Sequence, residues 1–201
     1  QHRIQAHEKP IRALVVGLDS LYTGSEDFTI GIFDAHSLQK RGELNAHRDI
    51  VSALALSSDR RWLYSGGADQ RVLMWDTRTK QVSRNFDPQD DRVISLATSP
   101  QGRFLASSSA DALWLWDAQS TRHGEETTVG HRQASISASF SPDNKWIATT
   151  GTDNSVRVWD THSGRQLRVY NRHTKQVYGL AVHPNGKEMA TGGADRTIII
   201  T

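Results

Sequence analysis

The stretch TTGTDNSVRVWD, residues 149–160, contains the pattern that decides the fold of this chain. Its central aspartate, Asp153, follows the hydroxyl of Thr149 by four residues and precedes Trp159 by six. Aspartates recur every 42 residues along the chain, at Asp27, Asp69, Asp111, Asp153 and Asp195. A fixed period of this length means that one supersecondary unit is copied five times, so the fold follows from the repeat.

Three other kinds of residue keep the same period. A hydroxyl stands four residues before each aspartate, at Thr23, Ser65, Ser107, Thr149 and Thr191. A histidine stands 20 or 22 residues before it, at His7, His47, His131 and His173. An aromatic residue followed by an aspartate comes five or six residues after it, at Phe33, Trp75, Trp116 and Trp159. These positions have stayed in register while the rest of the copies diverged.

The second copy shows how each unit should fold. Its apolar residues fall into four short runs, residues 51–56, 62–65, 71–75 and 81–86, separated by turn-forming residues such as Gly66-Gly67. Short apolar runs bounded by turn residues predict an antiparallel meander of four strands. No helical spacing of similar strength competes with this pattern. The expected fold class is therefore all-β.

A four-stranded sheet cannot bury both of its faces alone, whereas radial stacking covers each face with the next sheet. The repeat therefore predicts a β-propeller that forms a single domain over residues 1–201. The expected units cover about residues 6–44, 45–86, 87–129, 130–171 and 172–201, with residues 1–5 as an outer strand.

The fourth copy resembles a WD40 repeat. The resemblance rests on Gly130-His131, Ser141-Pro142-Asp143, Thr149 to Asp153 and Val156 to Asp160, and it extends over the whole chain. It implies a propeller, more often of seven blades than of five, whose last blade is completed by a strand from the N-terminus. Residues 2–5 therefore either complete the fifth blade and close a ring, or the chain is a fragment of a larger propeller; we favour the fragment.

Within a copy, the hydroxyl, the histidine and the aspartate are the three residue types that a nucleophilic hydrolase uses for catalysis. An enzyme needs this set once, but here it recurs in four copies, which favours a buried hydrogen-bond relay. The resemblance points the same way, because it implies a structural tetrad of Trp, Ser or Thr, His and Asp. The best-formed tetrads are expected to be His47, Ser65, Asp69 and Trp75, and His131, Thr149, Asp153 and Trp159. The other copies depart from the pattern at Phe33, Gln89 and Thr201.

If the tetrads are structural, function must come from positions that vary while the frame repeats. In a propeller of this type, the residues three and five after each histidine, and the residue before each turn aspartate, should lie on one face around the channel mouth. Arginine and tyrosine there are the types enriched at interfaces. The alternative is that the apolar members pack between blades. The candidate partner-binding residues are Arg12, Glu26, Arg92, Ile94, Ile136 and Tyr178.

The composition excludes several classes of function. A net charge of +2, without a basic arm, gives no support for nucleic-acid binding. The absence of cysteine excludes disulfides and thiol catalysis. We find no metal-ligand spacing, no phosphate-binding loop, no apolar run of 18 residues and no signal peptide. We expect no cofactor, no metal and no membrane association, and we favour the cytoplasm.

The favoured function is a non-catalytic scaffold that binds a protein or peptide on the channel-mouth face. One alternative is a sensor or targeting domain of a larger, enzymatic or signalling polypeptide. A propeller hydrolase that uses one of the Ser–His–Asp sets is the least favoured. The identity of the partner and the oligomeric state stay open.

Overall fold

The computed structural model describes residues 3–86, 91–110, 112–119, 127–129, 131 and 133–201. Contacts divide the chain into two compact units, Gln1–Val93 and Ile94–Thr201. The described residues form strands and turns without an α-helix. The prediction of an all-β fold is therefore confirmed.

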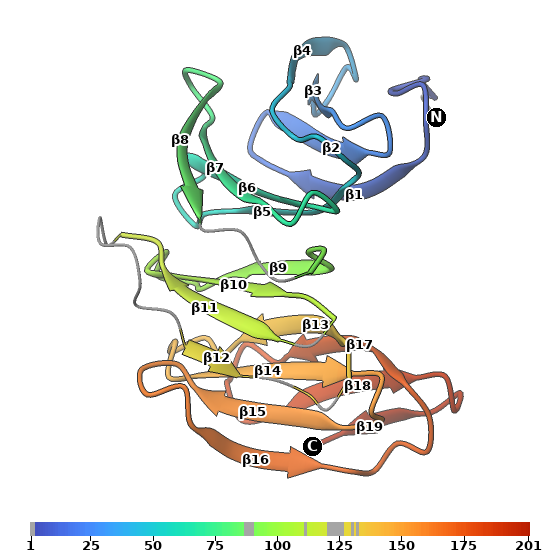
Figure 1. The fold of residues 1–201 in the computed structure, drawn as a ribbon, viewed down its shortest axis with the longest axis vertical. Coiled ribbons are helices and arrows are strands. Elements are labelled where there is room, and N and C mark those ends of the chain that lie inside the picture. The colour runs from blue at the N-terminus through green and yellow to red at the C-terminus, as the bar shows by residue number, and fades with distance from the viewer. Residues whose placement is uncertain (1–2, 87–90, 111, 120–126, 130, 132) are drawn as a thin grey trace. The chain divides into compact units, whose positions relative to one another are not determined.

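The first unit contains two four-stranded antiparallel sheets, each a meander in chain order (Figure 1). The strands of the first sheet are β1 (Ile11–Val16), β2 (Ser20–Ser25), β3 (Ile30–Asp34) and β4 (Lys40–Leu44). Those of the second are β5 (Val51–Leu56), β6 (Trp62–Gly67), β7 (Val72–Asp76) and β8 (Gln81–Phe86). The second sheet matches the four predicted runs to within two residues at each boundary.

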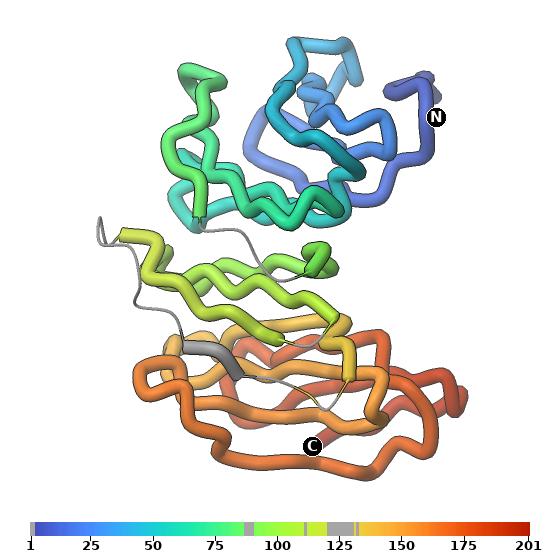
Figure 2. Tube along the Cα trace, in the orientation of Figure 1, coloured from blue at the N-terminus to red at the C-terminus, as the bar shows by residue number. Residues whose placement is uncertain are grey.

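The second unit contains three sheets among its described residues. The third sheet is β9 (Ser95–Thr98), β10 (Phe104–Ser108), β11 (Leu113–Asp117) and β12 (Thr127–Val129). The fourth sheet is β13 (Ser135–Phe140), β14 (Trp146–Gly151), β15 (Val156–Asp160) and β16 (Gln166–Tyr170). The fifth sheet has three strands, β17 (Val177–Val182), β18 (Met189–Gly193) and β19 (Ile198–Ile200). In Figure 2 the trace of the fourth sheet turns back on itself between successive strands, as expected for a meander.

The segment predicted to supply an outer strand is not in a strand. Residues 3–5 have no strand assignment, and Ile4 is exposed, while residues 1 and 2 lie outside the described part of the chain. With one apolar residue between two polar ones, this segment has little apolar surface to hold it against a sheet.

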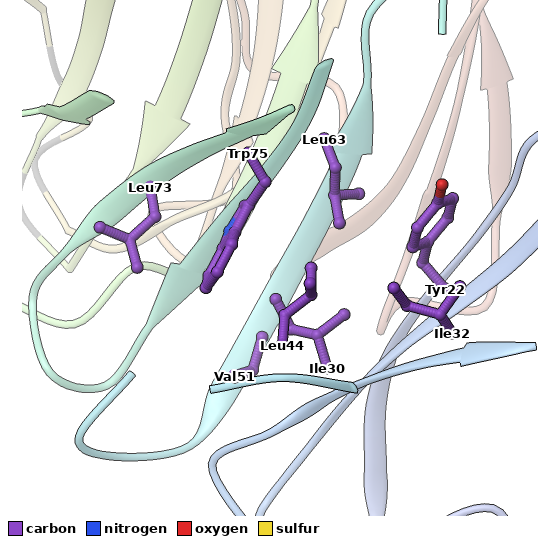
Figure 3. Packing of buried hydrophobic residues seen from close by; sticks show 8 residues of the cluster. All are labelled: Tyr22, Ile30, Ile32, Leu44, Val51, Leu63, Leu73 and Trp75. Carbon is purple, nitrogen blue, oxygen red and sulfur yellow. The ribbon is translucent and has the colours of Figure 1, made fainter. Parts of the chain in front are cut away.

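Consecutive sheets within a unit pack face to face. In the first unit, Tyr22, Ile30, Ile32 and Leu44 of the first sheet meet a set of apolar residues from the second sheet (Figure 3). The second sheet contributes Val51, Leu63, Leu73 and Trp75. In the second unit, similar clusters centre on Phe140 and Val177. Burial of such side chains stabilises each pair of sheets by roughly 1.5–3 kcal/mol per large residue.

Three turns in each well-formed copy need a residue with positive φ. In the fourth copy these residues are Asn144, Asn154 and Gly164, with φ of 59°, 64° and 66°. In the second copy the same three positions are held by Arg60, Gln70 and Lys80, with φ of 60°, 65° and 60°. Asn and Gly tolerate this conformation, whereas other residues adopt it at a cost. The two copies therefore have the same backbone but differ in how well their residues suit it.

Candidate functional site

The second copy forms a closed relay of four side chains. The indole Nε1–H of Trp75 on β7 donates to Ser65 Oγ on β6 at 2.8 Å. Ser65 Oγ lies 2.7 Å from His47 Nε2, and His47 Nδ1 lies 3.0 Å from the carboxylate of Asp69 in the β6–β7 turn. A carboxylate can only accept, so Nδ1 of His47 donates to Asp69.

The fourth copy repeats the relay. Trp159 Nε1 lies 2.8 Å from Thr149 Oγ1, which lies 2.8 Å from His131 Nε2, and His131 Nδ1 lies 2.9 Å from Asp153. Burial lowers the pKa of His131 and so favours the neutral ring. Burial alone would raise the pKa of Asp153, but hydrogen bonds from Ser155 and His131 outweigh it and hold that pKa well below its usual range.

The other copies form parts of the same relay. In the first copy, His7 lies 2.7 Å from Thr23 and 2.8 Å from Asp27, and Phe33 presents an edge to His7 without a donor. Burial tends to raise the pKa of Asp27, but hydrogen bonds from Thr29 and His7 lower it to about 2.

In the third copy, Trp116 donates to Ser107 at 2.8 Å, whereas Gln89 and Asp111 lie outside the described residues. In the fifth copy, His173 lies 3.0 Å from Thr191 and 2.8 Å from Asp195, and Thr201 takes the place of the tryptophan. A residue outside the expected pattern therefore leaves the rest of its relay in place.

The relays do not present a nucleophile to solvent. Ser65 and Thr149 are 0% exposed, and in both copies an indole N–H already occupies a lone pair of the hydroxyl oxygen. His7 and Asp27 line a cleft of about 600 Å³, but the hydroxyl of their set, Thr23, is not among the lining residues and is buried. A substrate carbonyl would have to reach within about 3 Å of such a hydroxyl for acyl transfer.

A glycine makes room for the histidine of each complete relay, although the sequence had suggested only a turn-forming role for it, as at Gly67. A Cβ on Gly67 would lie 2.8 Å from His47 Nδ1, and one on Gly151 would lie 2.4 Å from His131 Nδ1. Each glycine stands two residues before the turn aspartate, as Gly193 does beside His173. Because the glycine keeps this spacing in all three copies, its role beside the histidine could have been predicted from the sequence.

A β-bulge occurs at the position five residues after the histidine. The register between the first two strands shifts across Arg12, Ser52, Ile136 and Tyr178 in four of the described sheets. A bulge leaves its extra residue outside the ladder and re-aims the side chain. The sequence pattern predicted the position as a candidate but carried no sign of the bulge.

A repeated backbone hydrogen bond joins the two other predicted sets of positions. The residue before the turn aspartate donates its N–H to the carbonyl three residues after the histidine, as from Glu26 to Pro10 at 3.0 Å. Ala68 and Ile50, Thr152 and Ala134, and Ala194 and Gln176 form the same bond at 2.8–2.9 Å. The bond and the bulge thus place all three sets at the same end of each sheet. We call this end, beside the β2–β3 turn and its equivalents, the turn face.

The structure pairs two of the six candidate residues directly. Arg12 Nε donates to Glu26 Oε1 at 2.6 Å, and both belong to the first unit together with the exposed Arg92. In the second unit, Tyr178 is 53% exposed and donates its hydroxyl to Gln176 at 2.7 Å. Ile94 and Ile136 are half-buried. Arg12, Arg92 and Tyr178 are thus exposed, whereas Glu26 is half-buried like the two isoleucines.

A metal or membrane site has no support in the described part of the chain. Its residues contain no group of three or more His, Cys, Asp or Glu side chains that could hold a metal ion. Nor does any helix among them have the length and apolar character needed to cross a membrane.

The sequence matches the family model "WD domain, G-beta repeat" (WD40) four times, at residues 38–76, 80–117, 124–160 and 164–200. Each match begins at or just before the outer strand of one sheet and ends with the third strand of the next, as from β4 to β7. The sequence repeat is therefore offset by one strand from the sheet. The first three strands of the first copy, which include Phe33 in place of Trp, lie before the first match.

Two curated proteins show local similarity. One is Nuclear distribution protein PAC1-2 of Postia placenta, 44% identical over 39 residues, which are 19% of this chain. The other is a subunit of Chromatin assembly factor 1 from Mus musculus, 33% identical over 52 residues, which are 26% of this chain. The aligned part is 9% of each of these relatives.

Proposed function

Because the chain belongs to the WD40-repeat family, we propose that it is a non-catalytic scaffold that binds a protein or peptide on the turn face. The β-bulge carries this proposal. It recurs at one position of a repeated frame, yet the residue it re-aims differs in each copy, from Arg12 and Ser52 to Ile136 and Tyr178. Two of these residues, Arg12 and Tyr178, are exposed, so the same position of the frame offers a cation in one copy and an aromatic ring in another.

The chemistry of these side chains supports protein binding. Arginine and tyrosine are among the residue types that contribute most to interface energies, and both Arg12 and Tyr178 are exposed. Each has its polar group held by a neighbour, Glu26 or Gln176, which reduces the entropy lost on binding. The mouse relative is named as a subunit of Chromatin assembly factor 1, and a subunit binds other proteins.

A displayed library of random peptides, selected on the full chain, provides the probe for a test. We expect Arg12→Glu and Tyr178→Ala each to weaken binding of those selected peptides that contact the respective unit by about tenfold, which corresponds to about 1.4 kcal/mol. The readout is Kd by calorimetry. The matched control is Arg165→Glu, just before β16, with Leu167→Ala on β16; both residues are exposed, and the change should leave Kd unchanged. Selected peptides that bind all variants equally would exclude this face.

A further inference from the structure

The first unit has a recess at the end of its sheets that lies opposite the turn face. It is a cleft of about 470 Å³ between the β1–β2 hairpin, the β5–β6 hairpin and the β7–β8 turn. Its apolar lining is Leu18, Tyr22 and Leu56, and its charged lining is Asp59, Arg60, Arg61 and Arg78. We call it the arginine cleft.

The arginine cleft lies beside a short hairpin. Between the turn aspartate and the preceding histidine, the first copy has two residues fewer than the second, and the difference falls in the β1–β2 hairpin. Gly17 in this hairpin faces the cleft floor, because a Cβ there would lie 3.7 Å from both Leu56 and Tyr22. Leu18, next to it, is 73% exposed, which is unusual for a leucine next to an apolar floor.

The three arginines differ in their carboxylate partners. Arg61 lies over the ring of Trp62 at 4.6 Å and 3.8 Å from Asp76. Within the described part of the chain, Arg60 and Arg78 have no carboxylate within ion-pair distance. The nearby Asp59 carboxylate instead accepts from the Ser57 hydroxyl and the Arg61 backbone N–H. The pKa of Asp76 is lowered mainly by the backbone N–H of Thr79 and in part by the charge of Arg78, so Arg78 interacts with this carboxylate at longer range.

Arg60 has a left-handed backbone conformation, which glycine and asparagine adopt more readily than arginine. Its φ is 60°, and the same hairpin position in later copies holds Gly102, Asn144 and Gly186. A residue other than Gly or Asn in this conformation costs roughly 1 kcal/mol. The position of Arg78 is held in other copies by His36, Gln119 and His162. The second copy thus places two arginines beside the cleft where other copies have shorter side chains, one of them in a strained position.

We propose that the arginine cleft binds an anionic peptide. A phosphorylated or carboxylate side chain would lie between Arg60 and Arg78, and a neighbouring apolar side chain would cover Leu18, Tyr22 and Leu56. The planar guanidinium group suits both anions, because it donates two parallel hydrogen bonds. The apolar floor favours a peptide over a nucleic acid, because a peptide can place an apolar side chain next to its anionic group, whereas the backbone of a nucleic acid is continuously charged.

The test uses the full chain and short fluorescent peptides in which one leucine stands next to phosphoserine, glutamate or serine. We expect the phosphoserine and glutamate peptides to bind at least tenfold more tightly than the serine peptide, and their ratio identifies the preferred anion. Arg60→Asn with Arg78→Gln should weaken the better peptide at least tenfold, and Leu18→Ala should weaken it severalfold. The turn-face changes Arg12→Glu and Tyr178→Ala should have no effect, so this result is independent of the proposed function.

The arginine substitutions leave the fold intact by design. Arg60→Asn introduces the residue that the fourth copy has at this position, so it should raise the melting temperature while it lowers affinity. Arg165→Asn with Arg172→Gln is the control that removes the same charge elsewhere. Equal weakening by this control, equal binding of the serine peptide, or tighter binding of oligothymidylate through Arg60 and Arg78 would each overturn the proposal.

Discussion

The second and fourth copies have equivalent relays but different residues at their turns. Their three relay distances agree within about 0.1 Å, from 2.7 to 3.0 Å in the second copy and from 2.8 to 2.9 Å in the fourth. Yet the fourth copy fills its three positive-φ turns with Asn and Gly, and the second fills them with Arg60, Gln70 and Lys80. The comparison indicates that the relay fixes how the strands of the sheet are arranged, whereas the turn positions can carry long polar side chains.

The largest expected effect comes from removing the space for the relay histidine. Gly151→Ala would place a Cβ 2.4 Å from His131 Nδ1, so the ring must leave its position and the relay must break. We expect a loss of about 2–4 kcal/mol in the free energy of unfolding, from overpacking and unsatisfied groups together. Gly67→Ala should act in the same way on the second copy.

Gly192→Ala is the matched control for this prediction, because nothing lies within 4 Å of its Cβ position. Urea denaturation followed by tryptophan fluorescence measures all three variants. If Gly151→Ala were as stable as Gly192→Ala, the glycine would not be needed for the histidine.

Removal of the histidine itself should have the next largest effect. His131→Ala leaves the hydroxyl of Thr149 without its acceptor, although Asp153 keeps Ser155 and Arg157 as partners. The expected loss is about 1–3 kcal/mol in the same denaturation experiment. His47→Ala should cost a similar amount, because its relay has the same geometry. A melt that either substitution left unchanged would contradict the structural role of the relay.

The repeat allowed much of this architecture to be predicted from the sequence. The relay residues were predictable because their spacing follows from hairpin lengths, and hairpin length is visible as a residue count. The strand boundaries of the second copy followed for the same reason, since its apolar runs end where Gly66-Gly67 and other turn residues begin. A five-fold repetition makes each such signal far stronger than a single occurrence.

Other features depend on packing that no spacing reveals. The bulge at Tyr178 arises from a shift in the register between two strands, and the residue pattern of one strand does not show where such a shift occurs. Residues 1–5 were predicted to form an outer strand, because the resemblance assigns them one, yet residues 3–5 are not in a strand. The shorter β1–β2 hairpin is visible in the sequence, but the arginine cleft could not be predicted, because it depends on which side chains of the neighbouring β5–β6 hairpin and β7–β8 turn pack beside that hairpin.

A smaller and opposite effect is expected at the turns. Arg60→Asn and Lys80→Gly replace strained residues of the second copy with those of the fourth, and each should stabilise the chain by about 0.5–1 kcal/mol. The reverse changes, Asn144→Arg and Gly164→Lys, should destabilise by a similar amount. Melting temperatures of the four variants provide the comparison. Destabilisation by both forward changes would show that Arg60 and Lys80 make contacts worth more than their strain.

The smallest effect should appear as a dependence on pH. The folded state lowers the pKa of His131 below its ordinary value of 6.5, so between these two pKa values the unfolded chain binds more protons than the folded chain. This contribution to stability is therefore fully present above about pH 6.5 and declines as the pH falls below it. The pKa of Asp153 is already lowered from 3.8, so Asp153 affects stability only in a more acidic range. Free energies of unfolding between pH 5 and pH 8 should show a shallower slope for His131→Gln than for the unmodified chain, whereas the control Gly192→Ala, which removes no titratable group, should keep the original slope. An identical slope in His131→Gln would mean that the buried ring of the fourth copy does not set the acid sensitivity of this fold.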